Sequence, residues 1–419
     1  MKDPADFLEC FLVGGAVRDK ILGEPAGDRD WVVIGATEKR MENLGFKSVG
    51  KDFPVFLHPT THEEYALARR ERKVGTGYRG FKINTSPTVT LEEDLKRRDL
   101  TVNALALSVD GKLIDPFGGV ADLKAGRLRH VSPAFSEDPV RVLRIARFAS
   151  RFATKGFKVA SETEKLITNM VKNGEVDTLV PERVWRELVR ALSEHSPAIF
   201  FEILRNTGAL ACILPEIEVL FGIPQQDPAY PEGNVGTHAL MALEEAALLS
   251  NNPRIRFAAL VHDLEKGVLK GHTLPSNSDH EKPGVLRVNS MCLRLRAPID
   301  YSDLALIVTK NHLLLEKLPE LSGNAVLELL QAVNAFRKPK NVEFFVLACQ
   351  GISKVKIDAE KTNLATQLLK NYVASVRKLD LTDLENSYPK AKERGREAKR
   401  RKLAIIAETH VKWTKLCPN

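Results

Sequence analysis

Cysteine is scarce in this sequence, and the few cysteines are too scattered to suggest a disulfide framework. The 419 residues include five cysteines, and no two of them form a Cys-x-x-Cys pair. They stand at Cys10, Cys212, Cys292, Cys349 and Cys417. An odd, dispersed set is typical of free thiols in a reducing compartment. We therefore expect neither a disulfide-stabilised secreted fold nor a zinc ribbon.

Long apolar runs are also missing. No stretch of the sequence approaches the roughly 20 apolar residues that a helix needs to cross a bilayer. Residues 1–10 lack the basic and then apolar layout of a signal peptide. These absences predict a cytoplasmic protein.

Positive charge is in excess. Lysine and arginine together number 62 against 54 acidic residues, which gives a net charge of +8 and a pI near 9.1. A basic protein of this size favours a polyanionic partner, and RNA fits better than a membrane surface because no amphipathic anchor is evident. The length allows two to four domains, and a hydrophobic content of 43% is ordinary for globular proteins.

Residues 11–34 combine two features that suit phosphate chemistry. A short apolar strand over 11–13 runs into Gly14-Gly15 and then into helical spacing, so free N–H groups at a helix start can face a phosphate. Asp28 and Asp30 then lead into a second apolar strand, where residues two apart share a face. Two such carboxylates suit Mg²⁺, which binds carboxylates together with substrate phosphates. Each motif alone is more often a plain turn or a solvated loop edge, but together they indicate nucleotidyl transfer.

This stretch, GGAVRD followed by DRDW, resembles the class II nucleotidyltransferases, which include bacterial CCA-adding tRNA nucleotidyltransferases and poly(A) polymerases. The resemblance implies that Asp28 and Asp30 are catalytic and hold two Mg²⁺ ions. It also implies that Gly15 and Arg18 position the phosphates of the nucleotide.

A second motif, RRDLTVNA over residues 97–104, matches the family's RRDxTxNA pattern. Arg97 and Arg98 could clamp a triphosphate because the guanidinium fork donates two parallel hydrogen bonds. The alternative is a surface charge patch, which the motif match disfavours. Residues 71–81 resemble the family's mobile loop, although Arg70 replaces the threonine common in close relatives, and a plain hairpin connection is the alternative.

A third motif places arginines along one side of a predicted helix that begins near Ser136 and Asp138. Arg141, Arg144, Arg147 and Arg151 share one side at 3.6 residues per turn. The string resembles the family's nucleotide-recognition helix, which implies that Asp138, Arg141, Arg144 and Arg147 contact the nucleotide. We expect Asp138 to accept a hydrogen bond from the amino group of C or A and Arg141 to donate to the ring nitrogen. Residues 181–188 resemble the helix that braces it.

A histidine set in the second half resembles the HD phosphohydrolases. The candidate metal ligands are His238, His262, Asp263 and His280, with His312 following. The sequence departs from the working pattern, with Glu265 in place of glycine and Leu313 in place of an acid. We therefore expect a weakened metal site and little phosphohydrolase activity.

The predicted fold is α+β: a mixed sheet with helices in an N-terminal nucleotidyltransferase domain, followed by an all-α remainder. Strands are expected at 11–13, 31–35, 54–57, 64–69, 102–107 and 113–114. The expected domains are a catalytic head over 1–130, a helical neck over 131–220 and an HD-like helical domain over 221–340, followed by a helical tail over 341–419. The resemblance implies that the neck carries the nucleotide-recognition helix and a tRNA-binding region, and that the tail contacts tRNA.

The function that this resemblance implies is template-independent addition of CCA to tRNA lacking all or part of it, with CTP and ATP as substrates and Mg²⁺ as cofactor. Poly(A) polymerase and HD-type hydrolysis remain alternatives, and a non-catalytic tRNA-binding module is disfavoured by the intact carboxylate pair. The basic run over 390–402 is either a solvated face or a tRNA contact.

Overall fold

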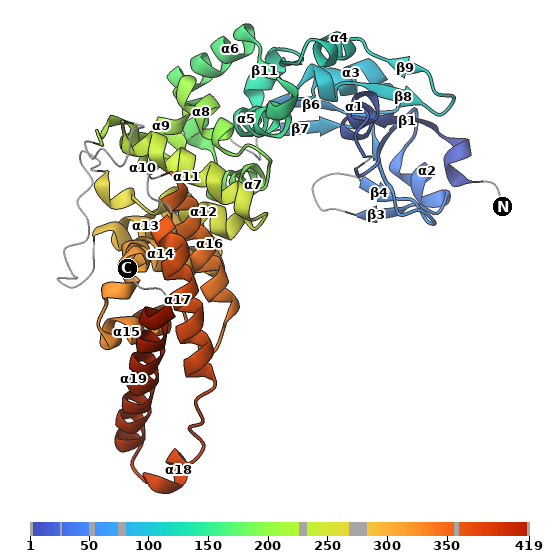
Figure 1. The fold of residues 1–419 in the computed structure, drawn as a ribbon. Helices are drawn as coiled ribbons and strands as arrows, with labels where there is room; N and C mark the ends of the chain where they lie inside the picture. The colour runs from blue at the N-terminus through green and yellow to red at the C-terminus, as the bar shows by residue number, and fades with distance from the viewer. Residues whose placement is uncertain are drawn as a thin grey trace. The chain divides into compact units, whose positions relative to one another are not determined.

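The computed structural model describes residues 3–25, 27–49, 55–73, 81–225, 233–267, 283–355 and 360–416. The chain forms two compact units, which are coloured along the chain in Figure 1. Unit 1 comprises residues 1–191 and 199–213, and unit 2 comprises 192–198 and 214–419. Among the described helices, none combines the length and apolarity needed to cross a membrane. The expected division into four domains stays a prediction.

Unit 1 is built on a mixed sheet of seven strands in the order β3-β4-β5-β2-β1-β8-β9. The strands are β1 (Glu9–Val13), β2 (Asp30–Ile34), β3 (Lys47–Val49), β4 (Val55–Leu57), β5 (Glu64–Leu67), β8 (Ala106–Ser108) and β9 (Leu113–Ile114). Strands β2 and β5 pair in parallel, whereas the other neighbours in this sheet pair antiparallel. The parallel register sets Asp30 opposite Glu64.

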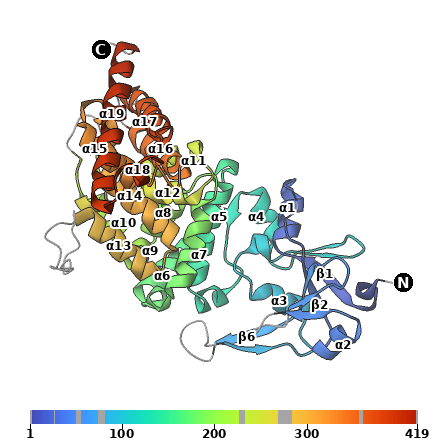
Figure 2. The same cartoon turned by 90° about the horizontal axis from the view of Figure 1, so that it is seen from below.

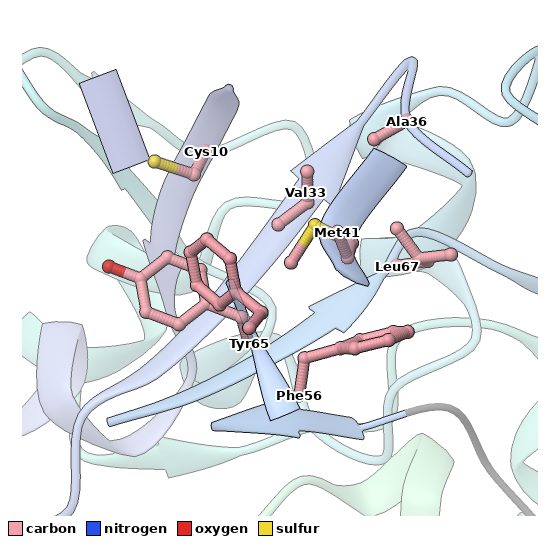
Figure 3. Packing of buried hydrophobic residues seen from close by; sticks show 8 residues of the cluster. Cys10, Val33, Ala36, Met41, Phe56, Tyr65 and Leu67 are labelled. Atoms are coloured by element: carbon pink, nitrogen blue, oxygen red, sulfur yellow. The ribbon is translucent and has the colours of Figure 1, made fainter. Parts of the chain in front are cut away.

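Both faces of this sheet are apolar, because successive residues of each strand point to opposite sides. Val33 joins a cluster with Met41, Phe56 and Tyr65, which Figure 3 shows packed between the sheet and helix α2 (Glu38–Asn43). Val32 belongs to the cluster on the other face. Alternation therefore places Asp30 on the same side as Val32, away from the Tyr65 cluster.

Most expected strands are confirmed within a residue or two, but the strand expected over 102–107 is wrong at its start. Residues Thr101–Asn103 form a 3₁₀ helix (η2), and β8 begins only at Ala106. The physical reason is that the Thr101 hydroxyl donates to Asp122 and the Asn103 amide donates to Asp99, so these side chains hold the backbone in a turn. Strand β3 was not expected from the sequence.

The segment expected to be a loop over 71–81 begins and ends in strands. Strands β6 (Arg70–Lys73) and β7 (Phe81–Asn84) pair antiparallel, as in a hairpin. The centre of the segment lies outside the described residues.

Helices make up the remainder of both units, and about 64% of the structure is helical. Those of unit 1 are α1 (Gly15–Leu22), α2, α3 (Leu91–Lys96), α4 (Gly119–Lys124), α5 (Val140–Phe152), α6 (Ser161–Lys172), α7 (Pro181–Leu192), α8 (Ala198–Asn206) and α9 (Ala209–Ile213). The all-α expectation needs one correction: β11 (Lys158–Val159) pairs in parallel with β10 (Arg127–Leu128).

Unit 2 is a helical assembly in which α11, α12, α14 and α16 pack on one another (Figure 2). Its helices are α10 (Pro215–Glu218), α11 (Val235–Leu249), α12 (Pro253–Val261), α13 (Pro283–Leu295), α14 (Ile299–Glu316), α15 (Gly323–Ala332), α16 (Lys340–Lys354), α17 (Glu360–Arg377), α18 (Leu384–Ser387) and α19 (Ala391–Leu416). The expected α+β fold class is confirmed.

Candidate functional site

The turn between β1 and α1 requires glycine at position 14 for two separate reasons. Gly14 has φ of 69° and ψ of −126°, a conformation that residues with a side chain rarely adopt. A Cβ added there would lie 2.8 Å from a terminal nitrogen of Arg98. Helix α1 starts at Gly15, directly after this turn. The glycine pair therefore brings the start of α1 and the Arg98 guanidinium close together.

Arg18, on helix α1, is buried and forms several hydrogen bonds near this turn. Its side chain is about 3% exposed and binds Asp19 through Nε at 2.8 Å and a terminal nitrogen at 2.7 Å. Its other terminal nitrogen donates to the Asn103 Oδ1 at 2.5 Å. Burial lowers the pKa of Arg18, and Asp19 opposes this effect. Arg18 thus connects the turn to the RRDxTxNA segment, and it also lines the cavity described below.

The two predicted metal carboxylates, Asp28 and Asp30, lie at the start of β2. Asp30 is the first residue of the strand, but Asp28 precedes the strand, so the expectation that both share a strand face is wrong for Asp28. Burial raises the pKa of Asp30, the negative charges of Glu64 and Asp28 raise it further, and Arg98 opposes them. A carboxylate held among other carboxylates favours a bound cation. The donor set therefore fits a divalent metal.

Glu64 is a functional candidate that the sequence reasoning missed. It lies opposite Asp30 in the parallel pairing of β2 with β5, and its charge acts on Asp30. Its place at the start of an apolar strand was visible in the sequence. The register that brings it to Asp30 was not, because 34 residues separate the two in the chain.

Asp94 orients both arginines of the RRD motif. Arg97 donates to one of its carboxylate oxygens from Nε at 3.0 Å and from a terminal nitrogen at 2.7 Å, and Arg98 contacts the other oxygen at 3.3 Å. Burial alone would raise the pKa of the fully buried Asp94, but Arg97 and Arg98 outweigh it, so the pKa is lowered. Asp94 therefore anchors both arginine side chains.

Asp99 connects the same motif to helix α5. Its Oδ1 accepts from the Leu100 backbone N–H at 2.8 Å and from the Asn103 amide at 3.1 Å. Its Oδ2 accepts from Arg144 Nε at 2.7 Å. Burial opposes ionisation of Asp99, but Arg144 and Asn103 outweigh burial and lower its pKa. The Asp99 side chain is therefore a buried, ionised bridge between two predicted motifs.

The arginine face of α5 is matched by carboxylates from elsewhere in unit 1. Arg144 binds Asp99, Arg147 binds Glu187 at 2.8 Å, and Arg151 binds Asp19 at 3.2 Å. The opposite, apolar face of α5 is buried; it comprises Val142, Ile145, Ala146 and Ala149. The repulsion among stacked guanidiniums is thus relieved by the protein itself.

The predicted base-recognition pair is engaged within the protein. The Asp138 carboxylate accepts from both terminal nitrogens of Arg183, at 2.9 and 2.8 Å. Arg141 donates to the backbone carbonyls of Ala134 and Arg97, at 2.9 and 2.5 Å. We expected Asp138 to lie on the helix, but α5 begins only at Val140. Asp138 precedes the helix, and its carboxylate accepts a hydrogen bond from the Val140 N–H.

The expected helix start near Ser136 is also wrong. Residues Pro133–Glu137 form a 3₁₀ helix (η3), and the Ser136 hydroxyl donates to the Pro133 carbonyl instead of capping α5. Proline at position 139 permits this arrangement because it needs no hydrogen-bond partner for a backbone N–H at the helix start.

One cavity of about 1150 Å³ in unit 1 collects all of the predicted nucleotide and metal residues. These are Gly15, Arg18, Asp28, Asp30, Arg98, Asp138, Arg141, Arg144 and Arg147. They come from the first half of α1, from the segment at and before the start of β2, from the RRD segment, and from α5 and the segment just before it. The site is thus a single polar chamber that contains carboxylates at and before the start of β2 together with arginines of α1, the RRD segment and α5.

Unit 2 contains a separate cluster of potential metal ligands. One ligand atom from each of His238, His262 and Asp263 lies within 4.8 Å of the others, and all three residues are buried. His312 Nε2 lies 3.9 Å from Asp263 Oδ1, whereas His280 falls outside the described residues. Nδ1 of His262 lies 2.7 Å from the Ala259 carbonyl oxygen, an arrangement that leaves Nε2 for a metal.

The same cluster has an internal cation. Lys266 Nζ lies 2.7 Å from Asp263 Oδ2. Burial opposes ionisation of Asp263, but His262 and Lys266 lower its pKa. The sequence reasoning discounted these histidines individually, and only the fold shows that three of the ligands converge.

Comparisons with known proteins show which proteins this chain is similar to. A family model described as the poly A polymerase head domain matches residues 10–129, and one described as the probable RNA and SrmB-binding site of polymerase A matches 156–221. Multifunctional CCA proteins of Thioalkalivibrio sulfidiphilus and Nitrosococcus oceani are each 57% identical over 343 residues, covering 82% of this chain and 84% of theirs. The fold resembles a solved CCA-adding enzyme in complex with ATP, with a TM-score of 0.65 at 20% identity, covering 98% of this chain and 90% of that one.

Proposed function

The chain belongs to the family of multifunctional CCA proteins, and we propose that the cavity of unit 1 is where it performs nucleotidyl transfer. The protein adds the 3′-terminal CCA to tRNA and takes CTP and ATP as substrates. The observation that carries the proposal is the convergence of Asp28, Asp30 and the motif arginines on one chamber. Its volume exceeds the roughly 300–1,000 Å³ of common small-ligand pockets, so it has room for a nucleotide and the end of an RNA strand.

Asp28 and Asp30 would hold the divalent metal that this family uses, and Mg²⁺ is our specific assignment. When bound, the metal supplies charge neutralisation at the triphosphate and activation of the tRNA 3′-hydroxyl. The carboxylate of Glu64 adds negative charge beside Asp30 and so strengthens the attraction for a cation.

The phosphates of the nucleotide would lie at the turn before α1. Gly14 gives the backbone its required conformation, and the N–H groups at the start of α1 would donate to the phosphates. Arg98, which lies over Gly14, supplies positive charge directly at this turn. Arg18 and Asn103 hold the turn in place from behind.

The nucleobase would be selected by Asp138 and Arg141. Both line the cavity, and both already hold partners within the protein. An incoming C or A offers an amino donor to Asp138 and a ring-nitrogen acceptor to Arg141. A wrong base would leave polar groups unpaired, at about 1–3 kcal/mol each.

In the decisive experiment, the protein is incubated with CTP, ATP, Mg²⁺ and a tRNA that lacks its terminal CCA. The RNA products are then sequenced. We expect two cytidines followed by one adenosine. Long adenosine tails without cytidine would instead identify a poly(A) polymerase. A product unchanged from the input would contradict the proposed reaction.

A second candidate function, metal-dependent phosphoester hydrolysis by unit 2, is favoured by the convergence of His238, His262 and Asp263. Because Glu265 and Leu313 depart from the working HD pattern, we expect weak or absent activity. The assay uses 2′,3′-cyclic nucleotides with Ni²⁺ or Mg²⁺. Robust hydrolysis by the wild-type protein that disappears in a His262→Ala protein would contradict the expected weak or absent activity.

A further inference from the structure

Three arginines of the cavity in unit 1 lie around the ring of Phe148, on helix α5. The guanidinium carbons of Arg147, Arg18 and Arg144 lie 4.6, 5.2 and 5.7 Å from the centre of this ring. A guanidinium within about 6 Å of an aromatic ring centre is attracted by the negative charge on the ring face. Phe148 itself is buried and lines the same cavity. The ring therefore stabilises arginines from two predicted motifs, the segment after the glycine turn and the arginine helix.

Arg144 shows why a ring at this position matters. Its Nε donates to Asp99 at 2.7 Å, and within the described part of the chain its terminal nitrogens have no hydrogen-bond partner. One hydrogen bond through Nε fixes that atom but leaves the plane of the guanidinium able to turn about it. The Phe148 ring supplies a second restraint, because a planar cation is attracted over the face of a ring. The two terminal nitrogens are thus held in a defined orientation at the cavity.

A second ring, Phe152, continues the aromatic surface of α5. The Phe148 and Phe152 rings are nearly parallel, with centres 6.1 Å apart and planes 4° apart. Arg18 lies 5.2 Å from each of the two ring centres, and Arg151 lies 5.4 Å from that of Phe152. Of the two rings, Phe148 lines the cavity and has the closer guanidinium, so it has the larger influence on the cavity.

Filling the core of unit 1 is the simpler role for a buried ring, and Phe157 illustrates that role. The centre of its ring lies 5.1 Å from that of Phe152. Among the residues that the structure describes, no guanidinium lies over the Phe157 ring. Phe157 is buried as well, so it offers a matched control: a neighbouring buried ring without the arginines.

We propose that Phe148 is a positioning residue for nucleotide binding. Its ring holds the guanidiniums of Arg18, Arg144 and Arg147 in the planes that a bound nucleotide requires. This inference rests on the proposed function, since it takes these arginines as nucleotide contacts. Because the ring orients the arginines before the nucleotide arrives, its effect falls on affinity more than on the chemical step.

The test replaces Phe148 in the full chain by mono-, di- and trifluorinated phenylalanine, incorporated at that position alone. Each fluorine withdraws electron density from the ring face while the shape of the side chain changes little, so the attraction for guanidiniums weakens in steps. Equilibrium dialysis gives the dissociation constants for CTP and ATP, and CCA addition gives KM and kcat. We expect the dissociation constants and KM to rise in the order of fluorine number, by about two- to tenfold over the series, with a smaller change in kcat.

Two further sets of proteins control this series. The same fluorinated residues at Phe157 should leave the dissociation constants and KM unchanged. Phe148→Leu keeps an apolar side chain but removes the ring, and it should raise KM at least as much as the trifluorinated residue does. Urea titrations report whether each protein is folded, and the fluorinated series keeps the comparison valid should Phe148→Leu not fold.

The outcomes separate this inference from the proposed function. A flat series at Phe148, or an equal rise in the Phe157 series, would overturn the inference and leave the ring as core packing alone. An Arg144→Gln protein with an unchanged KM for nucleotide would contradict the contact that the proposed function assigns to Arg144. If the wild-type protein adds no nucleotide to tRNA, the proposed reaction fails, whereas a stepwise rise in the dissociation constants would still support the role of the ring.

Discussion

At the scale of single residues, the cavity of unit 1 depends on groups that tolerate few replacements. Asp28 and Asp30 provide the carboxylates, and Gly14 provides the backbone conformation beside them. Replacing either Asp28 or Asp30 by alanine should abolish addition of C and of A alike while tRNA still binds. Radiolabelled CTP and ATP incorporation together with a tRNA binding assay checks this. Substantial turnover in both single variants would show that the carboxylates have another role.

Gly14 and Gly23 can be compared to test whether the close approach of Arg98 to the glycine turn matters. Both have positive φ, 69° and 70°, but only Gly14 has the Arg98 guanidinium above it. Gly14→Ala should cost about 1–3 kcal/mol of stability from backbone strain and should also raise the KM for nucleotide by displacing Arg98. Gly23→Ala should show strain without the change in KM. Equal KM values for the two variants would argue against a role for the turn in nucleotide binding.

Asp99 gives a prediction that depends on pH. Because its pKa is lowered in the folded state, it stabilises the fold above the ordinary Asp pKa of about 3.8 and this contribution is lost as the pH falls below that value. Asp99→Asn should reduce the free energy of unfolding by about 3–5 kcal/mol at pH 7, since it leaves Arg144 without its carboxylate. Urea titrations at several pH values measure this. A difference that stayed constant down to pH 3 would contradict the assignment of the charge.

At the scale of elements, we expect helices α5 and α7 to act together on the nucleobase. Arg183 on α7 holds both oxygens of Asp138, and Arg141 on α5 extends from the same region. We expect Arg141→Ala to reduce incorporation of CTP and ATP and to narrow their advantage over GTP and UTP by about 5- to 150-fold, the equivalent of 1–3 kcal/mol. Arg183→Gln should narrow the same advantage by releasing the Asp138 carboxylate.

The control for these two variants is Arg129→Gln, which removes an arginine–carboxylate pair elsewhere in unit 1. It should leave base selection unchanged. Full selectivity in both the Arg141→Ala and the Asp138→Ala proteins would place the selecting groups elsewhere, with Arg144 as the next candidate.

Much of the fold and of the candidate site could be predicted from the local sequence. The features that could not be predicted depend on contacts between residues that are distant in the chain. The glycine turn and the arginine face of α5 followed from spacing alone. The approach of Glu64 to Asp30 depends on a strand register, and the pairing of Arg147 with Glu187 depends on how α5 and α7 pack. A turn at Thr101–Asn103 stands where a strand was expected, because the Thr101 side chain donates to Asp122 and the Asn103 side chain donates to Asp99.

At the scale of the whole molecule, the net charge of +8 should govern RNA binding. Affinity for tRNA should fall steeply as salt rises, since each neutralised phosphate releases counterions. Dissociation constants measured at several ionic strengths test this, and a flat response would mean that the surplus charge is not used on RNA. Binding of an acceptor-stem minihelix offers a comparison, because it presents fewer phosphates and should give a shallower slope.

The arginine–carboxylate pairs of the cavity have a consequence for turnover. Asp99, Glu187 and Asp19 are permanent counterions, so a triphosphate that enters must compete with acids already in contact. Without a bound triphosphate, Arg144, Arg147 and Arg151 each have a carboxylate within 3.2 Å, so none of them needs an anion from solvent. The arginines of α5 thus keep their counterions in the empty chamber, and we expect this to lower the free-energy cost of releasing product between one nucleotide and the next.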